Sequence, residues 1–220
     1  TGSINRNPHY ETLQVLDNIS FNVKKGECLG IVGRNGSGKT TLLRILSHIY
    51  QPDAGSLETM GTVVPVLALG LGFHPELTAI KNIYQSSILL GISKKEIVER
   101  TEDIIKFAGL EKFAETKLKN FSSGMQMRLA FATAIQVDPT ILLLDEVIAV
   151  GDLNFQKKCL DVMRDFKKRG KSIILVSHNP SDIELLCDRA MFVKDGHIES
   201  IGKVPEVLES YKKYMSTLEK

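Results

Sequence analysis

Two patterns of apolar residues alternate along the chain: short apolar segments, and longer segments with apolar residues at helical spacing. Residues 141–144 form a continuous apolar run, and 27–32 and 172–176 are mostly apolar, which is typical of strands buried within a parallel sheet. Segments with apolar residues at helical spacing follow these runs. The predicted helices are 41–46, 123–137, 153–169, 180–187 and 204–215. In the first of them, Leu42, Leu43, Leu46 and Ile49 are expected to form one apolar stripe. Strands alternating with helices predict an α/β fold with a mostly parallel sheet.

Other segments predict strands of a more exposed kind. Residues 15–23 alternate apolar and polar side chains, which indicates a half-exposed strand, and valine and leucine fill most of 57–69. Near the end, 190–193 and 197–201 flank Asp195-Gly196, a dipeptide that favours a two-residue hairpin turn. We therefore expect a small antiparallel region beside the parallel sheet.

The middle of the chain has no strand pattern. From about 79 to 108 it is helical by periodicity, with a break at Gly91-Ile92-Ser93 and Ser93 as the N-cap of the second helix. We interpret residues 79–137 as a helical subdomain inserted into the α/β core. The whole of 1–220 is expected to be one domain. Thr1-Gly2-Ser3 is not a natural start, so residues 1–9 are taken as a trimmed beginning.

Composition limits the classes of function. The 220 residues are 43% hydrophobic and 25% charged, as in an ordinary globular protein, and the net charge of +2 gives no reason to expect nucleic acid. Three widely spaced cysteines argue against a disulfide framework and a zinc site, which fits a reducing compartment. No segment is long and apolar enough to span a bilayer, and no signal peptide is evident.

The strongest motif lies between the first buried strand and the first helix. Residues 33–40 match G-x-x-x-x-G-K-[ST], the phosphate-binding P-loop. They are Gly33, Arg34, Asn35, Gly36, Ser37, Gly38, Lys39 and Thr40. The glycines let backbone N–H groups turn toward phosphate oxygens, and the following helix directs its positive dipole end there. Lys39 can reach the β and γ phosphates, and the Thr40 hydroxyl can ligate Mg²⁺. The alternative is an ordinary glycine-rich turn, which the strand and helix on either side make less plausible.

Two carboxylates follow the buried run at 141–144. Asp145 stands where the Walker B aspartate approaches Mg²⁺, and Glu146 is the candidate base that orients an attacking water. The alternative is an acidic cap on the next turn.

Two further candidates are less specific. Ser122, Ser123 and Gly124 lie at a helix start and can form an anion site or a plain N-cap. His178 follows the strand 172–176 and can sense the γ-phosphate, although a lone histidine is more often structural.

The order of these motifs resembles an ABC-type ATPase subunit over nearly all of residues 10–200. Phe121–Met125 resembles the family's signature loop, with strict matches only at Ser122 and Gly124. The resemblance makes Asp152 the D-loop aspartate, His178 the switch histidine and Tyr10 the aromatic residue that stacks on adenine. An ordinary surface tyrosine is an equal alternative for Tyr10. Phe121–Met125, Ala149–Asp152 and Leu69–Thr78 together look like the polysaccharide and teichoic-acid exporter subfamily.

The resemblance implies a function. ATP and Mg²⁺ are held by Gly33–Thr41, with Lys39, Glu146 and His178 as catalytic residues, in a head-to-tail homodimer completed by Ser122 and Gly124 of the partner subunit. A membrane permease docks through about 67–120 at the cytoplasmic face of the inner membrane, and the pair exports a lipid-linked polysaccharide or related polymer. The sequence departs from the family where an ABC subunit often has a glutamine before the helical lobe, because Leu69 or Gly70 occupies that place.

Two alternatives belong to other classes. A soluble ABC ATPase of DNA repair or translation needs a long coiled coil or two tandem cassettes, and the chain has neither. A P-loop GTPase needs a guanine-reading Asn-Lys-x-Asp stretch, which is absent.

Overall fold

The computed structural model describes residues 13–66, 72–136, 138–145 and 152–218. Its strands are β1 (Cys28–Val32), β2 (Val63–Pro65), β3 (Ile141–Asp145), β4 (Ser172–Val176), β5 (Arg189–Lys194) and β6 (His197–Lys203). The α-helices are α1 (Lys39–Leu46), α2 (Ala79–Leu89), α3 (Lys94–Ala108), α4 (Ser123–Ile135), α5 (Leu153–Lys168), α6 (Pro180–Leu186) and α7 (Val204–Leu218). Two short 3₁₀ turns, Glu111–Phe113 and Leu118–Asn120, connect α3 to α4.

One sheet organises the core. Its strand order is β2-β3-β4-β1-β5-β6, and every neighbouring pair is parallel except β5 and β6. The expected α/β class, with a mostly parallel sheet and a small antiparallel region, is confirmed. Asp195 and Gly196 form the turn between β5 and β6 with positive φ angles of 47° and 81°, as a type I′ hairpin turn requires.

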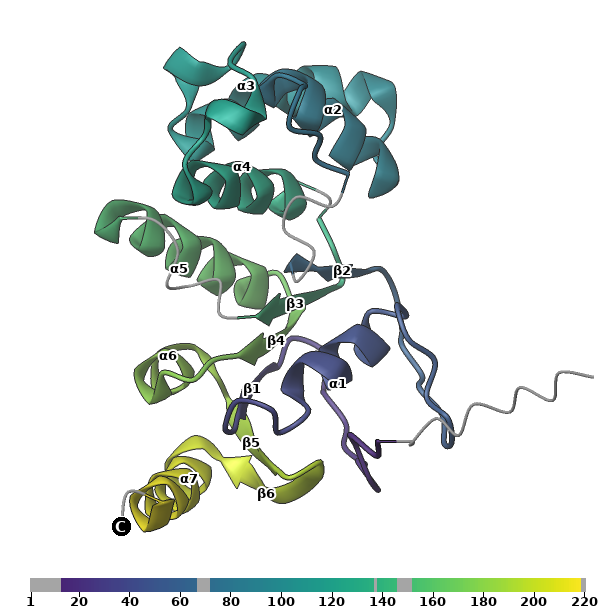
Figure 1. The fold of residues 1–220 in the computed structure, drawn as a ribbon, viewed down its shortest axis with the longest axis vertical. Helices are drawn as coiled ribbons and strands as arrows, with labels where there is room; N and C mark the ends of the chain where they lie inside the picture. The colour runs from purple at the N-terminus through teal and green to yellow at the C-terminus, as the bar shows by residue number, and fades with distance from the viewer. Residues whose placement is uncertain (1–12, 67–71, 137, 146–151, 219–220) are drawn as a thin grey trace, which may run out of the picture.

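The two faces of the sheet are covered by different helices. Side chains alternate along each strand, so Cys28 and Val32 of β1 face α5, α6 and α7, whereas Leu29 and Ile31 face α1. Figure 1 shows α1 on one side of the sheet and α5 to α7 on the other. Burial on both faces explains why the central strands have continuous apolar sequences.

The helices α2, α3 and α4 form a separate lobe above the sheet (Figure 1) with a hydrophobic cluster of its own. Ser93 caps α3 in a capping box with Glu96, as its position predicts. Phe107 of α3 packs against both this cluster and the core, where it meets Phe131 of α4 and Phe155 of α5. This aromatic cluster joins the lobe to α5.

Three sequence predictions about local structure are wrong. Residues 15–23 do not form a strand, although Leu16, Ile19 and Phe21 pack on the core with polar neighbours exposed, so one-sided burial occurs without ladder pairing. Of the predicted strand 57–69, only β2 is a strand among the described residues, because Gly61 at φ 105° turns the chain just before it. Ile49 is 53% exposed and lies beyond α1, because the chain leaves the helix at Ser47 and His48 has a positive φ of 57°.

Candidate functional site

The carboxyl ends of three neighbouring strands gather the predicted site residues at one edge of the sheet. β4 lies between β3 and β1, and in its register Val176 pairs with both Asp145 and Ile31. The P-loop leaves β1 directly after Val32, and His178 follows β4 by two residues. Asp145 and His178 therefore approach the P-loop side, where ligands of such sheets bind.

The N-terminus of α1 differs from those of helices α2 to α6. Each of α2 to α6 begins with a side chain that accepts a hydrogen bond from the helix backbone. These caps are Thr78, Ser93, Ser122, Asp152 and Asn179. The corresponding residue of α1 is Gly38, and no side chain caps this helix within the described residues. The first N–H groups of α1 are thus left for an anion, which the helix dipole also favours.

The P-loop has the shape of a phosphate cradle. Gly36 and Gly38 have φ angles of 82° and 100°, which only glycine adopts readily. A Cβ on Gly33 would lie 2.3 Å from the carbonyl oxygen of Val193, so this position has no room for a side chain. Ser37 is 4% exposed, and its Oγ makes no hydrogen bond to any described part of the chain. A buried hydroxyl without a partner inside the loop suits a ligand oxygen.

Lys39 belongs to the same cradle. It is 6% exposed, and its Nζ donates to the carbonyl oxygens of Gly33 and Arg34, both at 2.7 Å. The ammonium group is therefore folded back across the loop. Thr40 is exposed and Thr41 half-buried in the first turn of α1, so the Thr40 hydroxyl is accessible to a metal ion. These residues fit a Mg²⁺–nucleotide, and Asp145 at the end of β3, separated from β1 by β4, offers a carboxylate as a candidate second oxygen ligand.

The signature-type residues lie elsewhere. Ser122 caps α4, its Oγ accepting from the backbone N–H of Met125 at 3.2 Å, and Ser123 and Gly124 begin the helix. Because α4 packs against α2 and α3 in the lobe, it does not line the P-loop of the same chain (Figure 1). Within the single chain, Ser122 therefore acts as an ordinary N-cap of α4.

Asp152 also serves as a cap. Its Oδ1 accepts from the backbone N–H of Phe155 at 2.9 Å, and its Oδ2 lies 3.8 Å from Arg128 Nη1 of α4. Arg128 was not predicted, although a cation six residues after Ser122 on the same helix was visible in the sequence. Glu146, Tyr10 and residues 149–151 lie outside the described residues, so their roles remain predictions.

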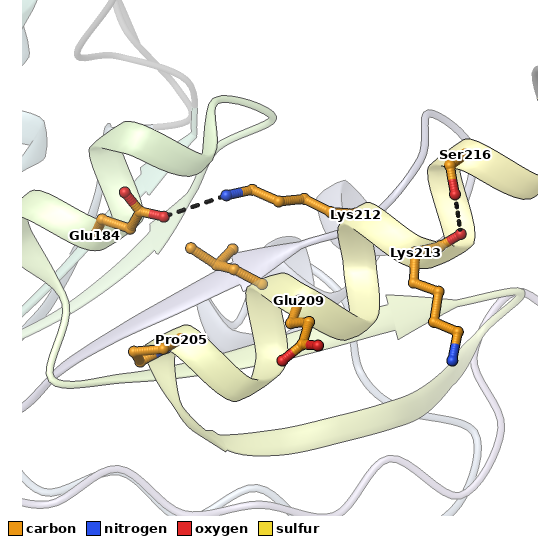
Figure 2. Close-up of a pocket in the computed structure, with 7 residues that line it drawn as sticks. Glu184, Pro205, Glu209, Lys212, Lys213 and Ser216 are labelled. Carbon is orange, nitrogen blue, oxygen red and sulfur yellow. Dashed lines mark hydrogen bonds and ion pairs between the residues drawn. The ribbon is translucent and has the colours of Figure 1, made fainter.

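A hollow of about 690 Å³ between α6 and α7 carries other chemistry (Figure 2). Glu184 and Lys212 face each other across it at 3.5 Å, and Glu209 and Lys213 complete a mixed set of charges. None of the predicted site residues lines it. The phosphate cradle at the sheet edge is therefore the candidate functional site.

This fold and this cradle define a P-loop nucleotide-binding protein. The chain belongs to the ABC transporter family, whose sequence profile matches residues 16–149. It is 45% identical over 201 residues to the O-antigen export system ATP-binding protein RfbB of Klebsiella pneumoniae, covering 91% of this chain and 82% of that protein. It is 39% identical over 200 residues to the teichoic acids export ATP-binding protein TagH of Bacillus anthracis, covering 91% of this chain but 36% of that protein. The family and subfamily resemblance of the sequence is confirmed.

Solved structures agree with the fold. An ATP-binding cassette solved as a dimer in a post-hydrolysis state, bound to ADP and phosphate, matches with a TM-score of 0.74 and 26% identity over 89% of this chain and 94% of that one. The ATP-binding subunit of an ABC transporter matches with a TM-score of 0.82 and 21% identity, covering 93% and 90% of the two chains, and supports the fold alone. No helix in the described ranges has the length and apolar character needed to cross a membrane.

Proposed function

We propose that this chain is the ATP-hydrolysing subunit of an exporter that moves a lipid-linked polysaccharide or related polymer through a partner permease. The observation that carries the proposal is the uncapped start of α1 inside a P-loop whose Ser37 hydroxyl has no partner among the described residues. Membership of the ABC transporter family and the export roles named for its relatives supply the kind of work that hydrolysis powers.

The residues take distinct roles in hydrolysis. Lys39 leaves the carbonyl oxygens of its own loop and donates to the phosphates, and Thr40 and Asp145 hold Mg²⁺. Mg²⁺ bound there would supply positive charge that neutralises the phosphate oxygens. Glu146 accepts a hydrogen bond from the attacking water and orients it, and His178 donates to the γ-phosphate. Catalysis is mostly positioning and electrostatic stabilisation, so each group must be held in place before the water attacks.

Two copies of the chain form the complete site. Since Ser122 and Gly124 lie in the lobe and not at the P-loop of their own chain, we propose that they contact the nucleotide of a partner subunit in a head-to-tail dimer. The dimeric state of the related ATP-binding cassette supports this arrangement. Nucleotide held between two copies makes closing of the dimer depend on ATP.

The permease is proposed to dock through residues of about 67–120 at the cytoplasmic face of the membrane. Asn82 is fully buried and fixes residues 74–78: its Oδ1 accepts from the His74 N–H at 2.6 Å, and its Nδ2 donates to the Leu77 and Thr78 carbonyls at 3.1 and 3.0 Å. A rigid loop suits coupling by backbone shape where the usual glutamine is missing. Co-purification of the chain with a permease tests this, and retention of the complex by a chain lacking the 74–78 sequence contradicts it.

Substitution of Glu146 tests hydrolysis. Glu146→Gln removes the negative charge that orients water but keeps the shape, so ATP binding and dimer formation persist while turnover falls by about 10²-fold or more. Glu102→Gln on the exposed face of α3 is the matched control and keeps wild-type turnover. Wild-type turnover of Glu146→Gln removes this residue from its role.

Mixing two inactive chains tests the shared site. Ser122→Arg blocks the contribution of one copy, and Lys39→Ala removes phosphate binding in the other. A mixed dimer keeps one intact composite site and regains part of the activity. Absence of any activity in the mixture, when both chains remain folded and associate, argues against the head-to-tail arrangement.

A further inference from the structure

The turn between β5 and β6 lies against the P-loop. The backbone N–H of Gly196 donates to the Ser37 carbonyl at 3.3 Å. On its other side, the carbonyl oxygen of Gly196 accepts from the backbone N–H of Asp17 at 2.9 Å. One residue of a distant hairpin therefore connects the P-loop to the segment that leads into β1.

The Val15 backbone and the Leu16 side chain pack closely against two glycines, Gly196 and Gly38. A Cβ on Gly196 would lie 2.5 Å from the Val15 carbonyl oxygen, and a Cβ on Gly38 would lie 2.6 Å from Leu16 Cδ2 and 3.1 Å from the same carbonyl. Both glycines have positive φ angles, 81° and 100°. The positive φ angles favour glycine at both positions, and at Gly196 the Val15 carbonyl also leaves no room for a Cβ.

His197 closes the contact from the hairpin side. Its Nε2 lies 3.1 Å from Asp17 Oδ2, and its Nδ1 lies 3.0 Å from the Asp195 carbonyl oxygen. Both neighbours are hydrogen-bond acceptors, so only the doubly protonated imidazolium can donate to both. Neutral imidazole turns one lone pair toward an acceptor and loses that bond.

We propose that Val15–Asp17 and Asp195–His197 form a clasp that holds the Ser37–Gly38 turn of the P-loop in the shape that binds the nucleotide's phosphates. His197 and Asp17 are positioning residues in this proposal, since they lie outside the P-loop and act on it through the Gly196 backbone. The proposal rests on the proposed function and adds a regulator of the same site: the affinity for triphosphate depends on the protonation of His197.

The direction of the pH effect follows from the contacts. The hydrogen bond to the Asp195 carbonyl raises the pKa of His197 most strongly. The Asp17 carboxylate raises this pKa as well, and partial loss of hydration lowers it. The charged groups that act on the ring are Asp17, from the segment before β1, and Asp195, from the turn itself; Lys194 and Glu199 of the same hairpin pair with each other at 3.7 Å. With a raised pKa, the clasp is complete below the ordinary histidine pKa and weakens as pH rises through the raised value.

The test compares His197→Gln with a matched variant on the same hairpin, Glu199→Gln, which does not touch Asp17. Dissociation constants are measured for Mg-ATP and for magnesium tripolyphosphate, which has no adenine, at about pH 6 and about pH 8.5 on either side of the histidine range. At the lower pH we expect His197→Gln to weaken both ligands by the same factor, about two- to fivefold for an exposed ion pair. At the higher pH the factor falls toward one, and Glu199→Gln matches the wild type throughout.

Two further variants strengthen the test. Asp17→Asn removes the charge that favours imidazolium, so it reduces the difference between the two pH values. Gly196→Ala drives a methyl group toward the Val15 carbonyl and should weaken both ligands at least tenfold; if that chain fails to fold, His197→Gln and Asp17→Asn still decide.

Equal affinities of wild type and His197→Gln at the lower pH overturn the clasp. Loss of Mg-ATP affinity with unchanged tripolyphosphate affinity overturns it as well, because the effect then lies at the adenine. Failure of the proposed function has a different signature, since the wild-type chain itself then binds neither ligand.

Discussion

Two buried hydroxyl groups permit a matched test of the P-loop. Ser37 in the loop is 4% exposed and Ser87 in α2 is fully buried, and the Oγ of each has no hydrogen-bond partner within the described structure. An unpaired buried hydroxyl costs about 1–3 kcal/mol of stability. Only Ser37 lies where a ligand oxygen is expected. Both unpaired hydroxyls therefore lower the stability of the ligand-free chain, but only that of Ser37 can form a hydrogen bond to bound phosphate.

Replacement by alanine removes that cost in both places. For Ser37→Ala we expect the free energy of unfolding of the nucleotide-free chain to rise by about 1 kcal/mol. In a chain of 220 residues, this corresponds to about 2–4 °C in the melting temperature. Ser87→Ala gains the same amount and about 0.5 kcal/mol more, because alanine is the better helix former in α2.

The two variants should differ in how much bound nucleotide stabilises them. A hydrogen bond from Ser37 to a charged phosphate contributes at least about 1.5 kcal/mol, so its loss weakens binding about tenfold. At a nucleotide concentration about 100 times the wild-type dissociation constant, binding stabilises the wild type by about 2.7 kcal/mol. With tenfold weaker binding, the same concentration stabilises Ser37→Ala by only about 1.4 kcal/mol. Ser87→Ala keeps the full wild-type gain.

Thermal melts with and without Mg-ATP measure both effects. The expected pattern is a raised melting temperature for both variants without ligand, and a nucleotide-induced shift halved in Ser37→Ala alone. A Ser37→Ala chain that is less stable than wild type without ligand, or that retains the full nucleotide shift, refutes the argument that the loop keeps this hydroxyl for phosphate.

Three other expectations concern stability and reactivity. Lys171, and less strongly Arg169, lower the pKa of Asp138, so these contacts stabilise the fold above the ordinary aspartate pKa and lose their effect as pH falls. In urea titrations, Asp138→Asn should therefore lower the free energy of unfolding by about 0.5–1 kcal/mol near pH 7 and leave it unchanged below about pH 2. Burial raises the pKa of Cys159 to about 12, so a thiol reagent at neutral pH should modify it only as fast as the chain unfolds, and prompt modification contradicts this. Phe107 and Phe131 stack with centroids 6.2 Å apart, and a double-mutant cycle to leucine should give a coupling of about 0.5–1.5 kcal/mol in the free energy of unfolding; zero coupling means that this pair does not join the lobe to the core.

The elements that could be predicted from the sequence are those that a local pattern specifies completely. β4 is predicted to the residue because an apolar run flanked by polar turn residues leaves little freedom in its ends. Residues 15–23 show the limit of the same argument. Their alternation correctly reports which side chains are buried, but a strand also needs a neighbouring backbone at the right spacing, and no such information lies in the segment itself.

The candidate site likewise contains some contacts that the sequence predicts and others that it does not. The sequence predicts Asp145 and His178 near the P-loop because the carboxyl ends of parallel strands meet at one edge of a sheet, which follows from the fold class alone. The approach of Gly196 to Val15, and of Arg128 to Asp152, joins residues from separate elements through loop geometry. Neither contact follows from strand order or helical spacing, so each had to be seen in three dimensions.

The start of α1 shows how one local feature carries information about both structure and function. An N-cap side chain stabilises a helix by about 1 kcal/mol relative to alanine, and glycine gives up about a few tenths of a kcal/mol of this. The sequence alone identifies Gly38 only as a glycine of the phosphate-binding loop. Gly38 has a φ of 100°, which residues with a Cβ rarely adopt, and a Cβ there would lie 3.1 Å from the Val15 carbonyl oxygen, so a capping side chain at this position is strained. The unsatisfied N–H groups then remain until an anion binds, and the missing cap becomes part of the affinity for nucleotide. By this argument, the stability that the helix lacks without ligand is returned on binding, which couples occupancy of the site to the order of α1.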